Sequence, residues 1–199
     1  MRQLAQSDIA TLEDVHELRG LSFDGLNLAG CDFSDRTIEE CSFRDCVLTG
    51  SRFNASTIRA SEFAQAGMQG VSLFAASFEE CKMMGIDFSR GGRFDAATFT
   101  RVNLDYVSLR GIDLSGVEFT GCQMRECDFT GANLTGTSLT ECDLTDADWA
   151  SATTSGTDLR GSSTRGLDLR RGPYGVIVTT RQAVAMVESL GVLVIDPTD

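Results

Sequence analysis

Proline, lysine and histidine are nearly absent from this sequence. The only prolines are Pro173 and Pro197, which excludes a disordered proline-rich polymer. Lys82 is the only lysine and follows a cysteine, so the phosphate-binding loop with its Gly-Lys pair is excluded. His16 is the only histidine. A histidine metal cluster needs several histidines and a serine–histidine–aspartate triad needs one beside the nucleophile, so neither site is expected. We therefore expect no enzyme, no metal site and no cofactor.

Basic charge and long apolar runs are also scarce. The 17 lysines and arginines face 29 aspartates and glutamates, a net charge of -12, so we expect no nucleic-acid partner and a positively charged protein partner. No apolar run approaches the roughly 18 residues that cross a membrane, and the first residues lack the pattern of a secretory leader. These features predict a cytoplasmic protein without membrane contact, whose seven cysteines stay reduced.

What the sequence does have is a five-residue period. Large, mostly apolar residues recur every five positions from Phe23 to Phe88 and, one residue out of phase, from Phe94 to Leu169, which makes thirty repeats. All seven cysteines stand two positions before such a central residue. Neither a helix of 3.6 residues per turn nor a long alternating strand keeps this period on one face. The pattern predicts a chain that turns a corner every five residues and buries two inward rows.

The repeat resembles the pentapeptide repeat family, whose motif is roughly Ala-Asp/Asn-Leu-x-x. Close matches are residues 132–136 (ANLTG) and 142–146 (CDLTD). The resemblance implies an all-β fold, a right-handed quadrilateral parallel β-helix with four repeats in each coil. We expect an N-terminal cap with a possible first degenerate repeat at 1–20, the β-helix at 21–171, and a C-terminal module at 172–199.

Two places weaken the repeat pattern. At Ser89–Arg93 one extra residue enters beside two glycines, which tolerate unusual backbone angles. This break is interpreted as a corner bulge or, alternatively, as a bend that fits a long rod to a curved partner. Thr154 and Thr164 occupy central positions, where polar groups need hydrogen-bond partners, so we expect weaker packing at 151–163.

The C-terminal module has a different pattern. Residues 176–178 and 192–195 are typical of strands, and Arg181–Leu190 is typical of a helix that Thr179 or Thr180 caps. An open solenoid edge must be covered, so capping is the minimal role of this short helix-containing module, and dimerisation is a role added to it. We expect the dimer contacts to come from Val176, Val178, Val184, Met186, Val187, Leu190, Val192 and Val194.

The ending is similar to that of the family subgroup that blocks or protects bacterial type II topoisomerases. The similarity covers residues 182–185 (QAVA), Gly191 and the apolar residues 192–194. In that subgroup the module joins two rods end to end, which implies a homodimer. Because no long loop interrupts the coils, the chain looks more like the mycobacterial fluoroquinolone-resistance and albicidin-immunity types than the plasmid-borne quinolone-resistance (Qnr) type.

Charge is spread unevenly along the repeats. From Asp113 to Asp158 there are nine acids and one base, Arg125. A line of anions can present to a basic groove what a nucleic-acid backbone presents, although aspartate is also common just before the central residue. We expect the partner-binding residues to be Asp87, Glu126, Asp128, Asp143, Asp146, Asp148 and Asp168.

The resemblance implies a function for such a rod. It implies a DNA mimic that binds DNA gyrase or topoisomerase IV and either inhibits the enzyme or protects it from poisons such as fluoroquinolones. The alternative is a non-catalytic structural scaffold, or an interaction module for an unrelated partner.

Overall fold

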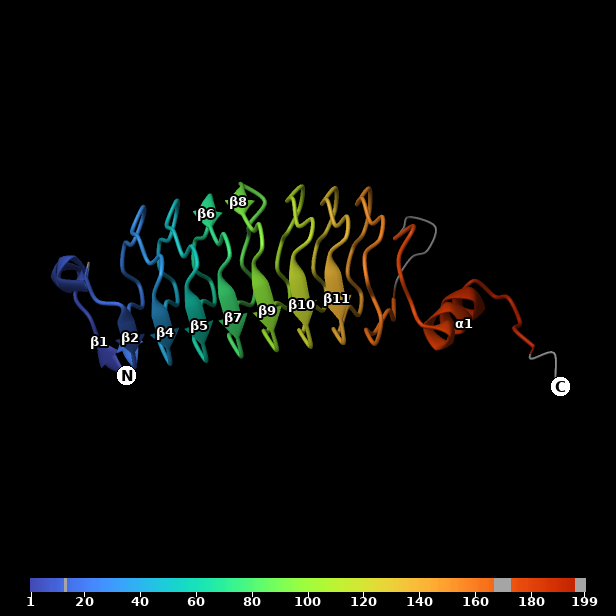
Figure 1. Cartoon of the computed structure of the whole chain (residues 1–199), viewed down its shortest axis with the longest axis horizontal. Helices are drawn as coiled ribbons and strands as arrows, with labels where there is room; N and C mark the ends of the chain where they lie inside the picture. Colours follow the sequence, from blue (N-terminus) through green and yellow to red (C-terminus); the bar gives the residue numbers. More distant parts are fainter. Residues whose placement is uncertain (13, 167–172, 196–199) are drawn as a thin grey trace.

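A computed structural model of the chain describes residues 1–12, 14–166 and 173–195. The chain winds into a straight rod of stacked coils with a helical segment at each end (Figure 1). Along one side, seven short strands form a parallel sheet in the order β11-β10-β9-β7-β5-β4-β2. These strands are β2 (Glu17–Arg19), β4 (Thr37–Glu39), β5 (Thr57–Arg59), β7 (Ser77–Glu79), β9 (Thr98–Thr100), β10 (Glu118–Thr120) and β11 (Ser138–Thr140).

Each regular coil contains twenty residues. Thr37 pairs with Thr57 in the sheet, and on another side of the rod a single bridge joins Asp128 to Asp148 at the same spacing. Successive coils therefore add strands to the same sheets, and each coil contacts only its neighbours. The all-β solenoid of parallel coils predicted from the sequence is confirmed.

The interior is filled by two rows of inward-pointing side chains. Phe23 stacks on Phe43 with ring centroids 4.5 Å apart, and Phe43 stacks on Phe63 at 4.8 Å. In the second row, thiols and hydroxyls donate hydrogen bonds to carbonyls of the preceding coil, as Cys127 Sγ does to the Leu104 oxygen at 3.0 Å. Burial raises the pKa of the Cys127 thiol to about 12. Cysteine therefore serves here as a small, neutral core residue.

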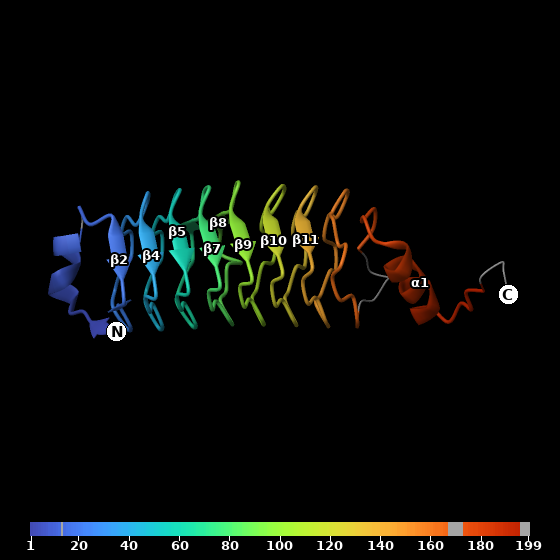
Figure 2. The same ribbon diagram turned by 60° about the horizontal axis from the view of Figure 1, so that its bottom comes forward.

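The register of the coils changes at the predicted break. Between β6 (Val71–Ser72) and β8 (Gly92–Arg93), Val71 pairs with Gly92, twenty-one residues later. Gly91 has a φ of +97°, in the left-handed region that favours glycine. A Cβ atom on Gly92 would lie 2.9 Å from Cε2 of Phe94. The rod runs straight through this corner bulge in two views (Figures 1 and 2).

The N-terminal end is closed by β1 (Arg2–Gln3) and the 3-10 helix η1 (Gln6–Leu12). The strand pairs with β3 (Leu21–Ser22) of the first coil. Leu4 and Leu12 are buried against the core. This segment therefore covers the hydrogen-bonding edge and the open end of the apolar interior.

The C-terminal end is closed by α1 (Thr180–Ser189), one residue earlier than the predicted helix. Thr179 is the N-cap, and Gln182 completes a capping box with it. The Gln182 side chain also donates to the carbonyl oxygens of Leu159, at 2.6 Å, and Ser162, at 2.9 Å. One side chain thus starts the helix and ties it to the last described coil.

The prediction of two C-terminal strands was wrong. Residues 192–195 are extended but form no strand, and within 176–178 only Ile177 makes a bridge, to Asp158. Residues 192–195 follow α1 and run away from the coils (Figure 1), so they meet no strand edge in the described chain, and a strand needs unpaired backbone groups to pair with.

Thr154 has partners for its central position. Its hydroxyl donates to the Tyr174 carbonyl at 2.6 Å and accepts from the Tyr174 amide at 2.9 Å. The polar core position is therefore satisfied.

Across the described residues, no helix has the length and apolar character needed to span a membrane.

Candidate partner-binding surface

One outer column of the rod carries aspartates in successive coils. Bridges join Asp87 to Ser108, Ser108 to Asp128 and Asp128 to Asp148. Bridged residues stand one above another at the strand spacing of about 4.8 Å. The structure therefore brings Asp128 and Asp148 together and leaves Asp87 two coils away from Asp128. Asp168, predicted for the same column, lies outside the described residues.

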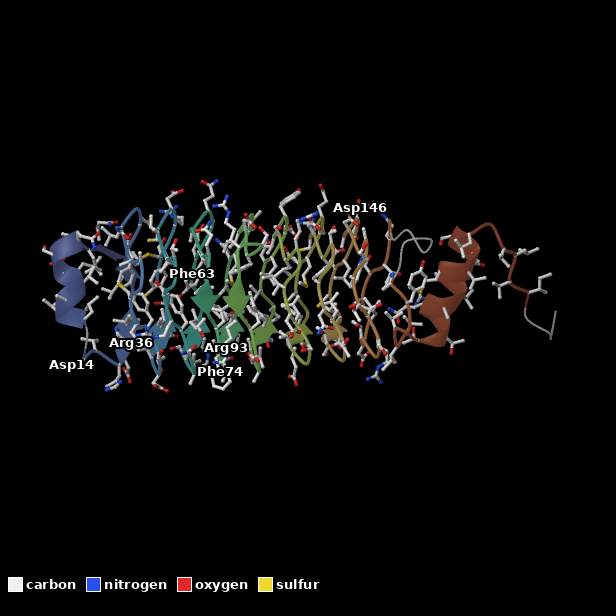
Figure 3. All side chains as sticks on the ribbon, turned by 90° about the horizontal axis from the view of Figure 1, so that it is seen from above. Asp14, Arg36, Phe63, Phe74, Arg93 and Asp146 are labelled. Carbon is white, nitrogen blue, oxygen red and sulfur yellow. The ribbon has the colours of Figure 1, made fainter. Side chains whose placement is uncertain are left out.

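Three further acids adjoin this column at the neighbouring corner and face. Glu126 and Asp146 occupy equivalent corners, with φ of 53° and 58°, and both are exposed. Asp143 is half-buried on the adjoining face. Figure 3 shows Asp146 at the outer edge of the rod. We call Glu126, Asp128, Asp143, Asp146 and Asp148 the acidic ridge.

The aspartates of the ridge also shape the turns beneath them. Carboxylate oxygens of Asp128, Asp143 and Asp148 accept backbone N–H groups two residues later, at 2.9, 3.1 and 2.9 Å. For Asp128, burial acts to raise the pKa, but hydrogen bonds from Thr130 and Arg110 outweigh it, and the pKa lies below its usual value. Asp128 is therefore charged at neutral pH.

Several acids of the N-terminal half pair with arginines from neighbouring coils. Ion pairs of 2.6 to 3.2 Å join Arg19 to Glu39, Arg44 to Asp24, Arg52 to Asp32, Arg59 to Glu79 and Arg101 to Glu79. Within the described chain, the only ridge residue with such a partner is Asp128, which Arg110 contacts at 3.0 Å. Between residues 113 and 148 the sequence has eight acids, and Asp128 is the one with an ion-pair partner in the described chain, so this stretch carries a run of unpaired negative charge.

Sequence reasoning missed a buried ion pair beside the ridge. Asp105 is 1% exposed, and it accepts from the Arg125 backbone amide at 3.0 Å and from the Arg125 guanidinium. The one arginine among the nine acids is thus paired with a buried carboxylate and not with the ridge. The sequence signal is an aspartate followed twenty residues later by an arginine. Asp24 and Arg44 have the same spacing and also form an ion pair.

The C-terminal module exposes many apolar side chains. Of the predicted dimer residues, four are half-buried, namely Val176, Val178, Val184 and Met186. The other four, Val187, Leu190, Val192 and Val194, are 39–51% exposed. Sequence reasoning missed Tyr174, Ile177, Leu193 and Ile195, which are 47–80% exposed. We call these eight exposed residues, four predicted and four missed, the apolar end. No residue of α1 is buried, so the helix keeps an uncovered surface.

The acidic ridge offers electrostatic attraction and shape to a partner. In the parts of the chain that the structure describes, no group of three or more histidine, cysteine, aspartate or glutamate side chains is placed to hold a metal ion. His16 is exposed and directly precedes β2, which lies at the opposite end of the sheet from β11. The ridge can therefore attract a positively charged surface without any reacting group.

Comparisons with known proteins agree with this architecture. Residues 71–149 match a family model described as the pentapeptide repeat region, which supports the repeat assignment over that part of the chain. No curated protein gives a significant match to the sequence.

Three solved structures of QnrB1, described as a plasmid-mediated fluoroquinolone resistance protein, are similar to the chain. A trypsin-treated variant has a TM-score of 0.84 and 22% identity and aligns over 97% of this chain and 95% of that one. A second trypsin-treated variant has a TM-score of 0.79 and 20% identity, with coverage of 98% and 95%. The full-length form has a TM-score of 0.72 and 19% identity, with coverage of 96% and 95%. At these identities the likeness establishes the fold.

Proposed function

We propose that this protein is a non-enzymatic, cytoplasmic DNA mimic that binds bacterial DNA gyrase or topoisomerase IV. Binding would inhibit the enzyme or protect it from poisons such as fluoroquinolones. The observation that carries the proposal is the acidic ridge, a line of carboxylates on a straight rod, of which Asp128 is the one with an ion-pair partner in the described chain. The description of QnrB1 as a fluoroquinolone resistance protein supports it, as does the resemblance to the loop-free topoisomerase-binding subgroup.

The charge density of the ridge is close to that of DNA. Duplex DNA carries one phosphate charge per about 1.7 Å of axis. The ridge has two carboxylates in one coil, Glu126 and Asp128, and three in the next, Asp143, Asp146 and Asp148. With a rise of about 4.8 Å per coil, this is one carboxylate per roughly 2 Å, or one unpaired carboxylate per roughly 2.4 Å once the pairing of Asp128 with Arg110 is allowed for. A basic groove built for a duplex would meet a similar line of charge on this rod.

The apolar end supports a homodimer within this proposal. A second copy would cover the apolar end and offer an edge to residues 192–195, which have none in their own chain. Exposed apolar patches of this kind mark protein contacts. Joining two rods at this end would also place the two acidic halves next to each other. Leu190→Asp and Val192→Asp together should convert a dimer to a monomer in light scattering, whereas Val47→Asp, at an exposed site of the N-terminal half, should not.

The test of the function is binding and supercoiling inhibition with purified gyrase at two salt concentrations. The double variant Glu126→Gln and Asp148→Asn removes two charges and keeps the acceptor oxygens. We expect about tenfold weaker binding at low salt and a shallower salt dependence, because charges across an interface govern both. The matched control is Asp45→Asn, an exposed corner residue in the column of Glu126 but in the N-terminal half.

Two results would contradict the proposal. One is equal gyrase affinity of the double variant and the wild type at low salt. The other is a folded protein that neither binds gyrase nor changes drug-stabilised DNA cleavage. The second result, with a monomeric protein, would favour the alternative of a scaffold for an unrelated partner.

A further inference from the structure

Two cysteines of the core stand directly above one another in neighbouring coils. Cys122 and Cys142 are the only cysteines of the sequence that are twenty residues apart, which is the length of one coil. Both side chains are buried, at 1% and 2% exposed. Elsewhere in the same column a residue without a thiol separates the cysteines, as Ser61 does between Cys41 and Cys81. The fold therefore creates one adjacent pair of thiols.

The backbone holds this pair in register. A bridge joins Gln123 to Asp143, and the Asp143 backbone amide donates to the Cys122 carbonyl oxygen at 2.9 Å. Residues stacked in this way stand about 4.8 Å apart. The Cα atoms of cysteines joined by a disulfide are about 4.4–6.8 Å apart. The backbone spacing therefore already suits a bond between the two sulfur atoms.

Both sulfur atoms occupy equivalent places in the core. Cys122 Sγ donates to the Phe99 carbonyl oxygen at 3.4 Å. Cys142 Sγ donates to the Phe119 carbonyl oxygen at 3.6 Å. Phe99 and Phe119 pair in the parallel sheet, so the two acceptors are also one coil apart. Thiols are weak donors, so turning the sulfur atoms toward each other costs little hydrogen bonding.

The two thiols also interact with each other. A hydrogen bond with Cys142 lowers the pKa of the Cys122 thiol, although burial acts to raise it. The same hydrogen bond, together with burial, raises the pKa of the Cys142 thiol. Cys122 therefore ionises more readily than Cys142, and the thiolate is the reactive form of cysteine.

We propose that Cys122 and Cys142 form a disulfide when the protein meets a peroxide, and that this bond fastens together the two coils that carry the acidic ridge. Glu126 and Asp128 of the ridge follow Cys122 in one coil. Asp143 directly follows Cys142 in the next coil. The proposal does not rest on the proposed function, because it concerns the rod itself and not its partner.

The reaction takes place in two steps. The Cys122 sulfur attacks one oxygen of hydrogen peroxide, so that an S–O bond forms, the O–O bond breaks, and the other oxygen leaves as water with the thiol proton. The Cys142 sulfur then attacks the Cys122 sulfur, so that the S–S bond forms, the S–O bond breaks, and a second water leaves with the Cys142 proton. The thiols lose two electrons and the peroxide gains them. Because the thiols are buried, the oxidant must be small and must enter through local opening of the coils.

The first experiment maps the bond in the full-length protein. The reduced, folded protein is treated with hydrogen peroxide, its remaining thiols are alkylated in denaturant, and it is digested with trypsin without reductant. Trypsin cuts after Arg110, Arg125 and Arg160, so the expected product joins peptide 111–125 to peptide 126–160. This product should be two hydrogens lighter than the sum of the two peptides, and dithiothreitol should separate it.

Two serine variants identify the cysteines that react. Peptide 126–160 also contains Cys127, so Cys142→Ser should abolish the linked product and Cys127→Ser should keep it. Serine suits the site of Cys142, because Ser162 occupies the same place one coil later and is buried there. Thermal melts should show that both variants keep the fold.

The second experiment measures the rate of unfolding in denaturant. Peroxide-treated wild type should unfold about tenfold more slowly than the reduced protein, because the bond closes a loop between neighbouring coils. Dithiothreitol should restore the faster rate. Cys142→Ser should unfold at the same rate before and after treatment, whereas Cys127→Ser should respond like the wild type.

Three results would overturn the proposal. The first is the absence of the linked peptides from the folded, peroxide-treated wild type. The second is a linked product that persists in Cys142→Ser. The third is a linked protein that unfolds as fast as the reduced one. None of these measurements involves a topoisomerase, so their failure would leave the proposed function standing.

Discussion

The side-chain nitrogen of Gln182 lies 2.6 Å from the carbonyl oxygen of Leu159, so a side chain attaches the helix α1 to the solenoid, beside the single backbone bridge that Ile177 makes to Asp158. The Oε1 atom of the same amide accepts from the Thr179 backbone amide at 2.9 Å. Gln182 therefore serves the helix and the last coil at once, and its loss should affect both.

Gln182→Ala should loosen the C-terminal module. It removes the capping box and leaves carbonyls of the last coil without donors, a loss of about 1–3 kcal/mol. Amide hydrogen exchange in α1 should accelerate accordingly, while the central coils keep their protection. Glu188→Ala, at an exposed site on the same helix, is the control. Equal exchange rates in the two variants would contradict the role assigned to Gln182.

Asp105→Ala should destabilise the rod more than Asp24→Ala. Both aspartates accept from the backbone amide of an arginine one coil later at 3.0 Å, but the Asp24 side chain is 23% exposed and that of Asp105 is 1% exposed. Water can replace the lost acceptor more readily at Asp24. We expect a loss of about 1–3 kcal/mol for Asp105→Ala, read from denaturant unfolding. A larger loss for Asp24→Ala would show that burial does not decide the effect.

Gly92→Ala should destabilise the corner bulge, and Gly67→Ala should not. Neither glycine has a left-handed φ, but a Cβ on Gly92 would lie 2.9 Å from the Phe94 ring, whereas one on Gly67 would meet its nearest neighbour at 3.5 Å. Crowding of a packed site costs about 1–3 kcal/mol. Gly67→Ala should be neutral or stabilising by up to about 1 kcal/mol. Thermal melts of both variants check the pair, and equal melting temperatures would contradict the argument.

Stability should fall at alkaline pH because of buried thiols. Burial raises the pKa of Cys127 to about 12 from an ordinary value of 9.0. Below about pH 9 the thiol is protonated in both states, whereas above it the unfolded chain loses the proton first, so stability declines as the pH rises toward 12. Cys127→Ser removes this contribution and keeps a hydrogen-bond donor. Melting temperatures at about pH 8 and 10.5 should therefore differ less in the variant, and an unchanged difference would contradict the prediction.

Much of the architecture could be predicted from the sequence because the period is short and is repeated many times. The inward rows, the coil of twenty residues and the helix beginning near Thr180 follow from local pattern alone. The ion pairs were missed because they join side chains of different coils, and the twenty-residue spacing that relates an aspartate to its arginine has meaning only once the coil length is known. Arg125 is an example. It stands among the acids of the C-terminal half in the sequence, but its guanidinium pairs with the buried Asp105 of the preceding coil.

The apolar end shows another limit of the sequence. Residues 192–195 have a strand-like composition, and the prediction of a strand failed because the described part of the chain brings no strand edge to them. Composition reports what a segment favours, whereas pairing depends on available partners.

The register change at Gly91 and Gly92 also bears on how such a gene can lengthen. Duplication or deletion of sixty bases within either half adds or removes one whole coil, and every inward residue keeps its place. An exchange between the two halves that moves a multiple of sixty bases leaves a junction one residue too long or too short. Beyond that junction the residues of the inward row would point outward. Tandem duplication can therefore lengthen the rod on either side of the bulge. A duplication that spans the bulge keeps the inward rows only if it includes the extra residue.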